Sequence, residues 1–252
     1  MSQTAASPSL PTIAFIGGGN MASAIIGGLI HQGHPASQIE VVEPWAEARE
    51  ALRKNYGIEA QAEAGPALQR AQIVVWAVKP QTFRDAAAQA KAHTQGALHL
   101  SVAAGIRSDS IAQWLGTERI VRTMPNTPAL VGKGMSALYA RPAVSAPERQ
   151  SIEAIMATTG EFLWVDSEPQ LDAVTALSGS GPAYVFYFLE AMTRAGTDMG
   201  LTAAQAHQLA VGTFVGASEL ARRSDETPAV LRQRVTSKGG TTYAALQSME
   251  AA

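Results

Sequence analysis

Cysteine is absent from this sequence of 252 residues. Its absence excludes disulfides, thiolate nucleophiles and thiolate metal ligands. Histidine is scarce as well, since only five are present, and none of them has the spacing of a metal site. The sequence therefore predicts no metal centre and no chemistry that depends on sulfur nucleophiles.

Charge and long apolar runs are also limited. Charged residues make up 16% of the chain and the formal net charge is −2, so nothing indicates binding to nucleic acid or an anionic membrane. No apolar run approaches the length of a membrane span, and residues 1–11 lack the basic and apolar regions of a signal peptide. We expect a cytoplasmic globular enzyme that begins with a flexible tail over residues 1–11.

Short β-rich segments alternate with helix-like segments up to about residue 125. This pattern is typical of a parallel, doubly wound α/β sheet. A further strand, helix and strand complete one α/β domain over residues 12–166. The predicted strands are residues 12–17, 39–43, 73–78, 97–102, 119–124, 134–139 and 161–165, and the predicted helices are residues 20–32, 45–55, 81–92, 108–115 and 146–159.

Beyond residue 167 the β signal disappears, which predicts an all-α second domain over residues 167–252. Residues 184–189 (YVFYFL) are apolar on nearly every face of a helix and need more cover than one small domain offers. A domain that dimerises would supply that cover, and a monomeric helical cap is the alternative. The predicted helices are residues 169–177, 182–199, 203–223 and 229–235.

A glycine motif, Gly17-x-Gly19-x-x-Ala22, joins the first strand to the first helix. The first glycine permits a tight turn, the second lets a pyrophosphate approach the backbone, and the small third residue lets helix and strand pack closely. The phosphates would then lie at a helix N-terminus, which favours anions. The motif predicts a Rossmann-type nucleotide site, with a purely structural turn as the alternative. The candidate residues are Gly17, Gly18, Gly19, Asn20, Met21 and Ala22.

The ends of the later strands carry further candidates for binding NADPH or NADH. Glu43 ends the second strand, where an acidic side chain binds the adenosine ribose and favours NAD, although a solvated glutamate is the alternative. Lys79 could reach a phosphate or ribose, or lie in an ordinary loop, and Asn126 marks either a ligand contact or a domain junction. Small residues at 101–105 would let a nicotinamide ring lie against backbone. The candidates are Glu43, Ala77, Val78, Lys79, Pro80, Ala103, Ala104 and Asn126.

Residues 236–242 (TSKGGTT) place two adjacent glycines among four hydroxyl side chains and a lysine. Successive N–H groups in such a turn form a concavity that suits a carboxylate. The alternative is a helix N-terminus capped by Thr or Ser beside a glycine hinge. Because a nucleotide-binding domain has no substrate site of its own, the anion site is the stronger hypothesis.

These motifs together resemble those of the pyrroline-5-carboxylate reductases, which catalyse the last step of proline synthesis. The first two motifs are shared with many Rossmann oxidoreductases, whereas the last two are much more specific. The resemblance extends from about residue 12 to residue 250. It rests on residues 15–22, 77–80, 101–105, 124–128, 177–184 and 236–242.

The resemblance implies a Rossmann domain followed by a helical domain that interlocks into homodimers, and it allows a decamer built from them. It places the active site between the nucleotide loops and helical-domain residues, including those of a partner. Gly240, Thr241 and Thr242 would hold the substrate's carboxylate and ring nitrogen, and Glu168 matches a position that contacts substrate in some members. Thr242 is the catalytic candidate, and because a threonine hydroxyl is a poor acid, we expect it to orient the ring nitrogen.

The implied reaction is NAD(P)H-dependent reduction of the cyclic imine 1-pyrroline-5-carboxylate to L-proline, by hydride transfer to the C=N carbon. Two departures from the family pattern stand out. Glu43 occupies a position where NADPH-preferring members tend to have Ser, Asn or Arg, and the sequence ends at Ala252 where the family continues in a long helix. A related reductase of another small imino or hydroxy acid, or a non-catalytic dinucleotide sensor, are the alternative functions.

Overall fold

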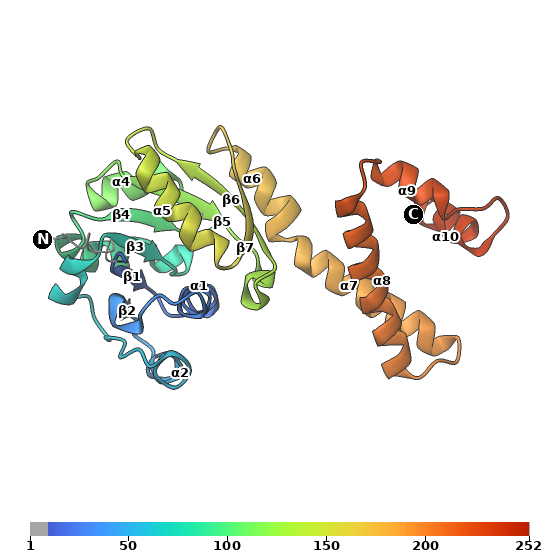
Figure 1. Cartoon of the computed structure of the whole chain (residues 1–252), viewed down its shortest axis with the longest axis horizontal. Coiled ribbons are helices and arrows are strands. Elements are labelled where there is room, and N and C mark those ends of the chain that lie inside the picture. The colour runs from blue at the N-terminus through green and yellow to red at the C-terminus, as the bar shows by residue number, and fades with distance from the viewer. Residues whose placement is uncertain (1–9, 252) are drawn as a thin grey trace, which may run out of the picture. The chain divides into compact units, whose positions relative to one another are not determined.

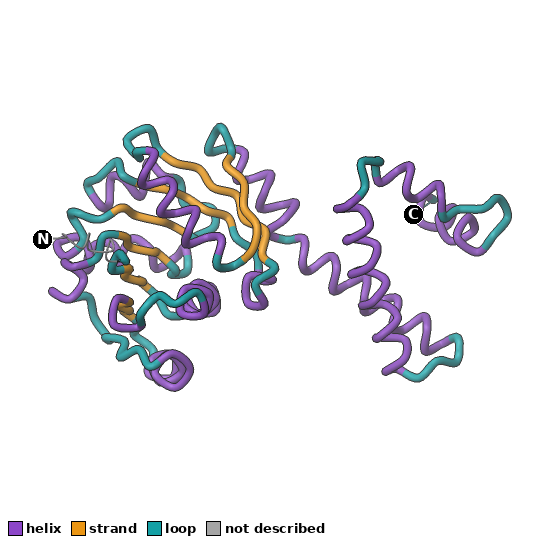
Figure 2. Tube along the Cα trace, viewed as in Figure 1, coloured by secondary structure: helices purple, strands orange, loops and turns teal. Residues whose placement is uncertain are grey.

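The computed structural model describes residues 10–251, so the predicted tail lies almost entirely outside the described residues. The chain forms two compact units, one ending at Pro182 and one beginning at Ala183. Figure 1 shows the order of the elements, and Figure 2 shows that all of the strands belong to the first unit.

One seven-stranded sheet organises the first unit, in the order β2-β1-β3-β4-β5-β6-β7. The strands β1 to β5 pair in parallel. The predicted doubly wound α/β fold is therefore confirmed. The strands are β1 (Ile13–Ile16), β2 (Ile39–Val42), β3 (Ile73–Trp76), β4 (Leu98–Ser101), β5 (Ile120–Met124), β6 (Gly134–Ala140) and β7 (Gly160–Trp164).

Helices cover both faces of this sheet. In β1, Ile13 and Phe15 belong to the apolar cluster under one set of helices, and Ala14 and Ile16 belong to the cluster on the opposite face. Because successive side chains of a strand point to opposite faces, a strand covered on both sides must be apolar throughout. The helices α1 (Asn20–His31), α2 (Ala46–Tyr56) and α5 (Ala146–Ala157) cover one face, and α3 (Phe83–Ala90) and α4 (Ser108–Leu115) cover the other.

The sequence pattern did not reveal one pairing, because β6 runs antiparallel to β5. The connection between them holds only the 3₁₀ turn Thr127–Val131. A parallel return needs a crossover of a dozen or more residues, usually a helix, so this short connection forces the strand to reverse direction. The strand β7 then pairs in parallel with β6.

Beyond the sheet the described residues form helices. The helix predicted over residues 169–177 differs from the structure, where α6 (Gln170–Val174) passes into a π-helix, Thr175–Gly179. The helix α6 packs on β5 and β6, and the two compact units divide after Pro182. The remaining helices are α7 (Gly181–Asp198), α8 (Ala203–Arg223), α9 (Pro228–Arg234) and α10 (Thr241–Glu250).

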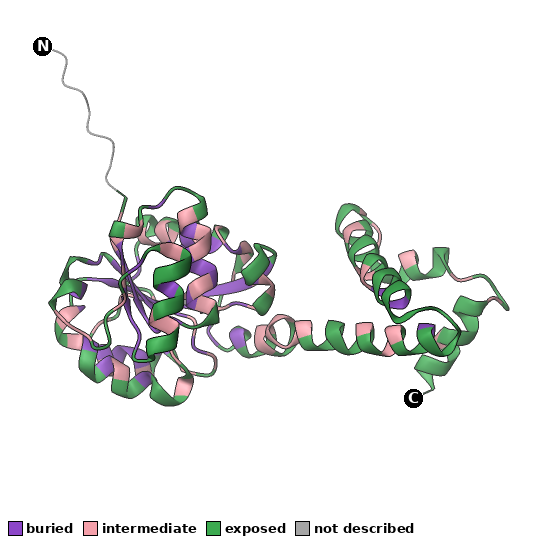
Figure 3. Cartoon of the chain, turned by 90° about the horizontal axis from the view of Figure 1, so that it is seen from below, coloured by how far each residue is buried: buried purple, intermediate pink, exposed green. Residues whose placement is uncertain are grey.

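Most residues of the helix α7 are exposed in the single chain (Figure 3), and several of them are large and apolar. Tyr184, Phe186, Tyr187 and Phe188 are each more than half exposed. Such a face needs a cover that the chain's own second unit does not provide. Within residues 10–251, no helix combines the length and the apolar character that crossing a membrane requires.

A buried aromatic cluster fills the sheet face beneath α3. The indole of Trp76 stacks on Phe83 with a centroid distance of 5.0 Å, and its Nε1 donates a hydrogen bond to Nδ1 of His99 over 3.0 Å. Burial lowers the pKa of His99 to about 4, and the positive charge of Arg119 acts in the same direction. His99 is therefore neutral at pH 7, as acceptance of the indole proton requires.

The lowered pKa of His99 predicts a loss of stability in weak acid. Its ordinary pKa is 6.5, so between pH 6.5 and pH 4 the unfolded chain binds more protons than the folded one. We expect the free energy of unfolding to fall by about 3 kcal/mol as the pH falls through this window. Denaturant unfolding at pH 7.5, 5.5 and 4.5 measures the effect.

The variant His99→Gln should lose most of this pH dependence, because glutamine still accepts the indole hydrogen bond but does not titrate. The exposed His207 provides the control, since His207→Gln should keep the wild-type slope. An unchanged slope in His99→Gln would contradict the assignment.

Candidate active site

The candidate nucleotide residues meet at one edge of the sheet. The carboxyl ends of β1, β2, β3 and β4 lie side by side because these strands are parallel. The chain leaves β1 towards β2 on one side and later adds β3 on the other, so the strand order reverses between β1 and β3. Ligands of open α/β sheets bind in the crevice outside such a switch point.

The glycine loop after β1 has the backbone that its motif predicts. Gly17 adopts a φ of +97°, and a Cβ there would lie 2.5 Å from the carbonyl oxygen of Ala77. A Cβ on Gly18 would lie 2.8 Å from Cδ1 of Leu52, whereas one on Gly19 would meet no atom within 4 Å. The protein's own packing therefore requires a glycine at position 17, where the clash is with backbone, whereas at Gly18 the end of the Leu52 side chain would have to move. Gly19 leaves open space beside the start of α1.

That open space fits a pyrophosphate. Gly19 is the N-cap of α1, no side chain caps the helix, and its first turn holds no acidic residue. The unpaired N–H groups of a helix N-terminus and its dipole favour negative charge. Asn20 and Met21 begin this helix, and the fully buried Ala22 packs against the sheet. These residues fit a dinucleotide, and their contacts with it remain predictions.

Glu43 lies beside the glycine loop. The side chain is only 7% exposed, so the alternative of a solvated strand end is wrong. Its Oε2 accepts a hydrogen bond from the N–H of Gly18 over 2.7 Å, and its Oε1 accepts one from the N–H of Trp45 over 2.9 Å. Nη1 of Arg49 donates to the backbone carbonyls of Glu43 and Pro44. The carboxylate thus joins two backbone segments at the end of β2.

At the ends of β3 and β4 the candidate nucleotide-binding residues offer mainly backbone groups. Ala77 continues from β3, with its N–H bonded to the carbonyl of Ile16 over 2.8 Å, and Val78 lies near Gly17. Lys79 is exposed, and Pro80 opens a 3₁₀ turn. After β4, Ala103 is buried and its N–H lies 3.3 Å from Oγ of Ser101, with Ala104 following it. Nucleotide contacts by these residues remain predictions.

The side-chain amide of Asn126 forms hydrogen bonds within the protein itself. Its Oδ1 accepts the N–H of Met135 over 2.9 Å, and its Nδ2 donates to the carbonyl oxygen of Ser178 over 3.2 Å. The hydroxyl of Ser178 donates in turn to the carbonyl of Met135. Asn126 therefore joins the end of β5, the start of β6 and the π-helix, all within the first unit. A cofactor contact remains a prediction.

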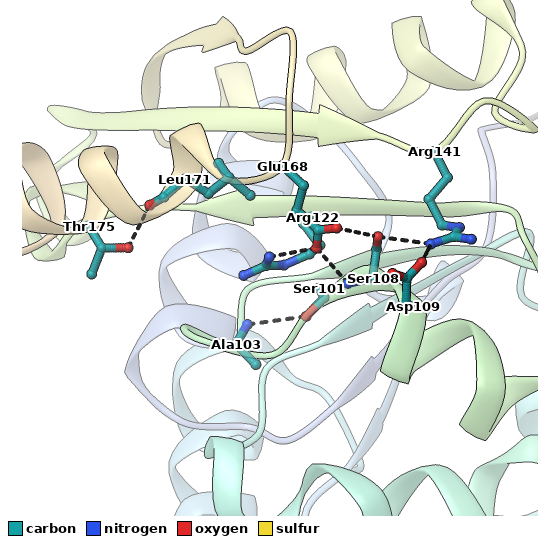
Figure 4. Close-up of polar contacts among 9 residues, drawn as sticks. All are labelled: Ser101, Ala103, Ser108, Asp109, Arg122, Arg141, Glu168, Leu171 and Thr175. Atoms are coloured by element: carbon teal, nitrogen blue, oxygen red, sulfur yellow. Dashed lines mark hydrogen bonds and ion pairs between the residues drawn. The ribbon is translucent and has the colours of Figure 1, made fainter.

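Glu168 is the centre of a buried polar network (Figure 4). Its Oε2 accepts the hydroxyl of Ser108 over 2.7 Å, and its Oε1 accepts the backbone N–H of Ser108 over 2.5 Å. Nη1 of Arg122 donates to Oε1 over 2.7 Å, and Arg141 donates to the Ser108 hydroxyl. Glu168 therefore connects the start of α4 to β5 ahead of α6, and the predicted substrate contact is untested.

The network explains the ionisation of Glu168. Burial opposes its charge, but the hydrogen bonds from Ser108 and Arg122 outweigh burial and hold the pKa of this carboxyl below its ordinary value. These partners, Ser108, Arg122 and Arg141, were not among the residues predicted for the site. A signal was present for one of them, since Arg122 is a charged residue in the otherwise buried strand β5.

We expect the variant Glu168→Gln to destabilise the first unit by about 2–3 kcal/mol. Glutamine accepts fewer hydrogen bonds and leaves the guanidinium of Arg122 buried without its counter-charge. The loss should shrink as the pH falls, because a carboxyl whose pKa is lowered in the folded state contributes its full stability above the ordinary pKa of 4.5 and loses it as the pH falls through the lowered pKa. Denaturant unfolding at pH 7.5 and pH 4 measures both effects. Equal stability of the two proteins at pH 7.5 would contradict a stabilising network.

Three candidate substrate residues, Gly240, Thr241 and Thr242, lie together at the start of α10 in the second unit, whereas Glu168 belongs to the first unit. Gly239 has a φ of +76°, and a Cβ on Gly240 would lie 2.9 Å from Oγ of Ser237. Gly240 is the N-cap of α10, and no side chain caps the helix. Thr241 and Thr242 are its first helical residues, so the alternative in which a threonine or serine caps this helix is wrong.

The absence of a side-chain cap matters for binding. The first N–H groups of a helix have no partner within it, and they attract a carboxylate when nothing else bonds them. The hydroxyls of Thr241 and Thr242 lie in the same turn and are exposed. Among residues 10–251 no group of three or more His, Asp or Glu side chains could hold a metal ion.

The fold and the glycine loop define a nicotinamide-dinucleotide oxidoreductase with a helical second unit. The comparisons with known proteins give its family. The family model "Pyrroline-5-carboxylate reductase dimerisation" matches residues 168–252, and "NADP oxidoreductase coenzyme F420-dependent" matches residues 12–105. With the relatives described next, these matches show that the chain belongs to the pyrroline-5-carboxylate reductase family.

The chain is 46% identical to pyrroline-5-carboxylate reductase of Pseudomonas aeruginosa over 245 residues, which is 96% of this chain and 90% of that protein. It is 38% identical to the Escherichia coli enzyme over 94% of this chain and 89% of that protein. The solved reductase of Coxiella burnetii superposes with a TM-score of 0.86 at 36% identity, covering 96% of this chain and 91% of that one. The Plasmodium falciparum structure, solved with NADP bound, has the same TM-score at 28% identity and covers 90% of its own chain.

Proposed function

We propose that this chain catalyses the NAD(P)H-dependent reduction of 1-pyrroline-5-carboxylate to L-proline. The observation that carries the proposal is the substrate loop, residues 239–242, which starts an uncapped helix inside the matched dimerisation region. An uncapped helix N-terminus suits the carboxylate of an imino acid. The glycine loop after β1 fits the dinucleotide.

The bound nicotinamide supplies the hydride that reduces the C=N carbon. The substrate loop positions the imino acid, with its carboxylate at the N–H groups after Gly240 and at the hydroxyl of Thr241. The exposed Lys238 adds positive charge next to this loop. Holding two reactants in a reactive geometry accounts for a large part of a rate enhancement.

Thr242 acts on the ring nitrogen in this proposal. Its hydroxyl hydrogen-bonds the nitrogen and fixes the face that the C=N carbon presents. A substrate that binds as the iminium already carries the charge that activates the carbon, so no strong acid is needed. The side chains of the substrate loop include no carboxyl or imidazole group that could act as a general acid, which agrees with an orienting role for Thr242.

The assembly we propose is a homodimer formed through the second unit. The exposed apolar face of α7 supports it, because a second copy would remove these side chains from water. We propose further that such dimers can assemble into a decamer, and light scattering distinguishes the dimer from the decamer. We also propose that the protein acts in the cytoplasm, because the reaction needs a supply of reduced nicotinamide nucleotide.

The test is the oxidation of NADPH and of NADH by the purified chain with 1-pyrroline-5-carboxylate, followed at 340 nm, with proline identified by chromatography. Turnover with either nucleotide supports the proposal. The lack of turnover with both, in protein shown to be folded and dimeric, would overturn it. Nucleotide binding without turnover would instead support the dinucleotide sensor.

A further inference from the structure

The loop between β4 and α4, residues 102–107, carries Ala103 and Ala104, the candidates for contact with the nicotinamide ring. We propose that Glu168 is a positioning residue for this nicotinamide loop, which it holds in place for the ring rather than contacting the substrate itself. The inference rests on the proposed function in taking residues 102–107 as the loop that receives the nicotinamide.

The beginning of the nicotinamide loop is fixed at the end of β4. Ser101, the last residue of β4, pairs in register with Arg122 of the neighbouring strand β5. Its hydroxyl oxygen accepts the N–H of Ala103 over 3.3 Å, and the N–H of Val102 donates to the carbonyl oxygen of Trp76 over 3.1 Å. The first two residues of the loop are therefore held by the sheet.

The other end of the nicotinamide loop is fixed by Glu168, which is 60 residues away from Ser108 in the sequence. Arg107 is the N-cap of α4, and its side chain makes no capping hydrogen bond. The carboxylate of Glu168 takes this place, because it accepts both the backbone N–H and the hydroxyl of Ser108, the first residue of the helix. A negative charge at a helix N-terminus is also favoured by the helix dipole. Glu168 thus fixes the start of α4 and with it the end of the loop.

One buried ion pair joins the two ends of the loop. Nη1 of Arg122 donates to Oε1 of Glu168 over 2.7 Å, so the residue that pairs with Ser101 also bonds the residue that holds Ser108 (Figure 4). All four residues are at most 8% exposed. Because a buried ion pair is screened much less than an exposed one, this contact holds the base of the nicotinamide loop closed.

The carboxylate of Glu168 has little capacity left for a substrate. Its Oε1 accepts the backbone N–H of Ser108 and Nη1 of Arg122, and its Oε2 accepts the Ser108 hydroxyl. A carboxylate has about four acceptor positions, so three of them are occupied. These contacts commit the buried side chain to the protein itself, which favours a positioning role over substrate contact.

A residue that positions the nicotinamide loop should affect one half of the nucleotide. The glycine loop, which would take the pyrophosphate, is held separately by the carbonyl oxygen of Val42 and the carboxylate of Glu43. Release of the loop end at Ser108 would therefore misplace the nicotinamide and leave the adenosine half in its site. Hydride transfer depends strongly on this geometry, since a displacement of about 1 Å can cost about 100-fold in rate.

Isothermal titration tests the two halves of the nucleotide separately. The full chain is titrated with NADH and NADPH, and with ADP-ribose and 2′-phospho-ADP-ribose, which lack the nicotinamide. The variant Glu168→Gln should bind each dinucleotide about tenfold more weakly, about the value of one lost hydrogen bond, and should bind the nicotinamide-free compounds as the wild-type chain does. Its kcat should fall by about tenfold or more. The variant Ser108→Ala removes one donor but keeps the backbone N–H, so it should show the same pattern with a smaller loss.

The variant Glu148→Gln is the matched control. Glu148 accepts the backbone N–H and the hydroxyl of Ser145 and is bonded by Arg119, so its carboxylate has the same kinds of partner as that of Glu168. These contacts lie at the start of α5 and not at the nicotinamide loop. The control should lose stability but keep the wild-type affinity for all four compounds.

Equal weakening of the dinucleotides and the nicotinamide-free compounds would overturn the inference, because it would show a general loss of structure. Unchanged dinucleotide affinity in folded protein would overturn it as well, and a raised KM for 1-pyrroline-5-carboxylate alone would instead place Glu168 at the substrate. Ser108→Ala decides the question if Glu168→Gln gives no cooperative thermal transition. A wild-type chain that does not turn over 1-pyrroline-5-carboxylate contradicts only the proposed reaction, since the titrations need no turnover.

Discussion

The variant Thr242→Val is expected to lower kcat by about 100-fold or more while the chain still binds nucleotide with unchanged affinity. Valine keeps the branched shape of threonine but removes the hydroxyl that would orient the ring nitrogen. A small misplacement of the reacting carbon costs about this much in rate. Steady-state kinetics with 1-pyrroline-5-carboxylate and titration with nucleotide measure the two quantities.

Two further variants make this prediction specific. Thr242→Ser restores a hydroxyl at the same place and should recover much of the lost rate. Ser248→Ala removes an exposed hydroxyl from the same helix, α10, and should have no effect on kcat. If Thr242→Val kept the wild-type kcat, the orienting role would be wrong. A non-catalytic dinucleotide sensor would instead show no turnover of 1-pyrroline-5-carboxylate in the wild-type chain or in any of these variants.

The second large effect is expected at Gly17, where alanine should destabilise the fold by about 4 kcal/mol. A side chain at a φ of +97° costs about 1–2 kcal/mol, and a Cβ that lies 2.5 Å from the carbonyl oxygen of Ala77 adds the cost of overpacking. The loop after β1 cannot relieve the clash without separating it from the end of β3. Denaturant unfolding measures the loss.

Two other glycines separate the contributions. Gly33 has a φ of +91° with no atom near the position of a Cβ, so Gly33→Ala should cost only the backbone strain, about 1–2 kcal/mol. Gly19→Ala meets no protein atom and should keep the fold, but its methyl group should weaken nucleotide binding about tenfold or more, because it occupies the space for the pyrophosphate. Wild-type affinity in Gly19→Ala would contradict the proposed pyrophosphate position.

Much of the architecture follows from local patterns. The apolar strands β1 and β3 could be recognised because a strand buried on both faces has no polar positions. The predicted bounds of α8 agree with the structure, because its capping box at Thr202 and Gln205 marks its start. The π-helix after α6 was missed, since its wider turn arises where Ser178 bonds to Asn126 and Met135 rather than from any local propensity.

In the candidate site too, some features follow from local sequence and others depend on distant residues. Local spacing predicted the glycine loop, because the requirements for a left-handed turn and a small packing residue fall within six residues. It also placed Glu43 at a strand end, but it left open whether this side chain is solvated. That question depends on Gly18, which lies 25 residues away and whose N–H holds the carboxylate. Likewise no residue close to Glu168 in the sequence indicates that Ser108 and Arg122 hydrogen-bond its carboxylate.

By itself, therefore, the sequence determined the fold class, the position of the dinucleotide loop and the family resemblance, because each depends on short-range periodicity or on motifs of a few residues. Only the tertiary structure decided the antiparallel β6, the buried partners of Glu43, Asn126 and Glu168, and the absence of a side-chain cap at α10. These features depend on which distant segments meet, and hydrogen bonds between residues far apart leave no periodic signal in a sequence.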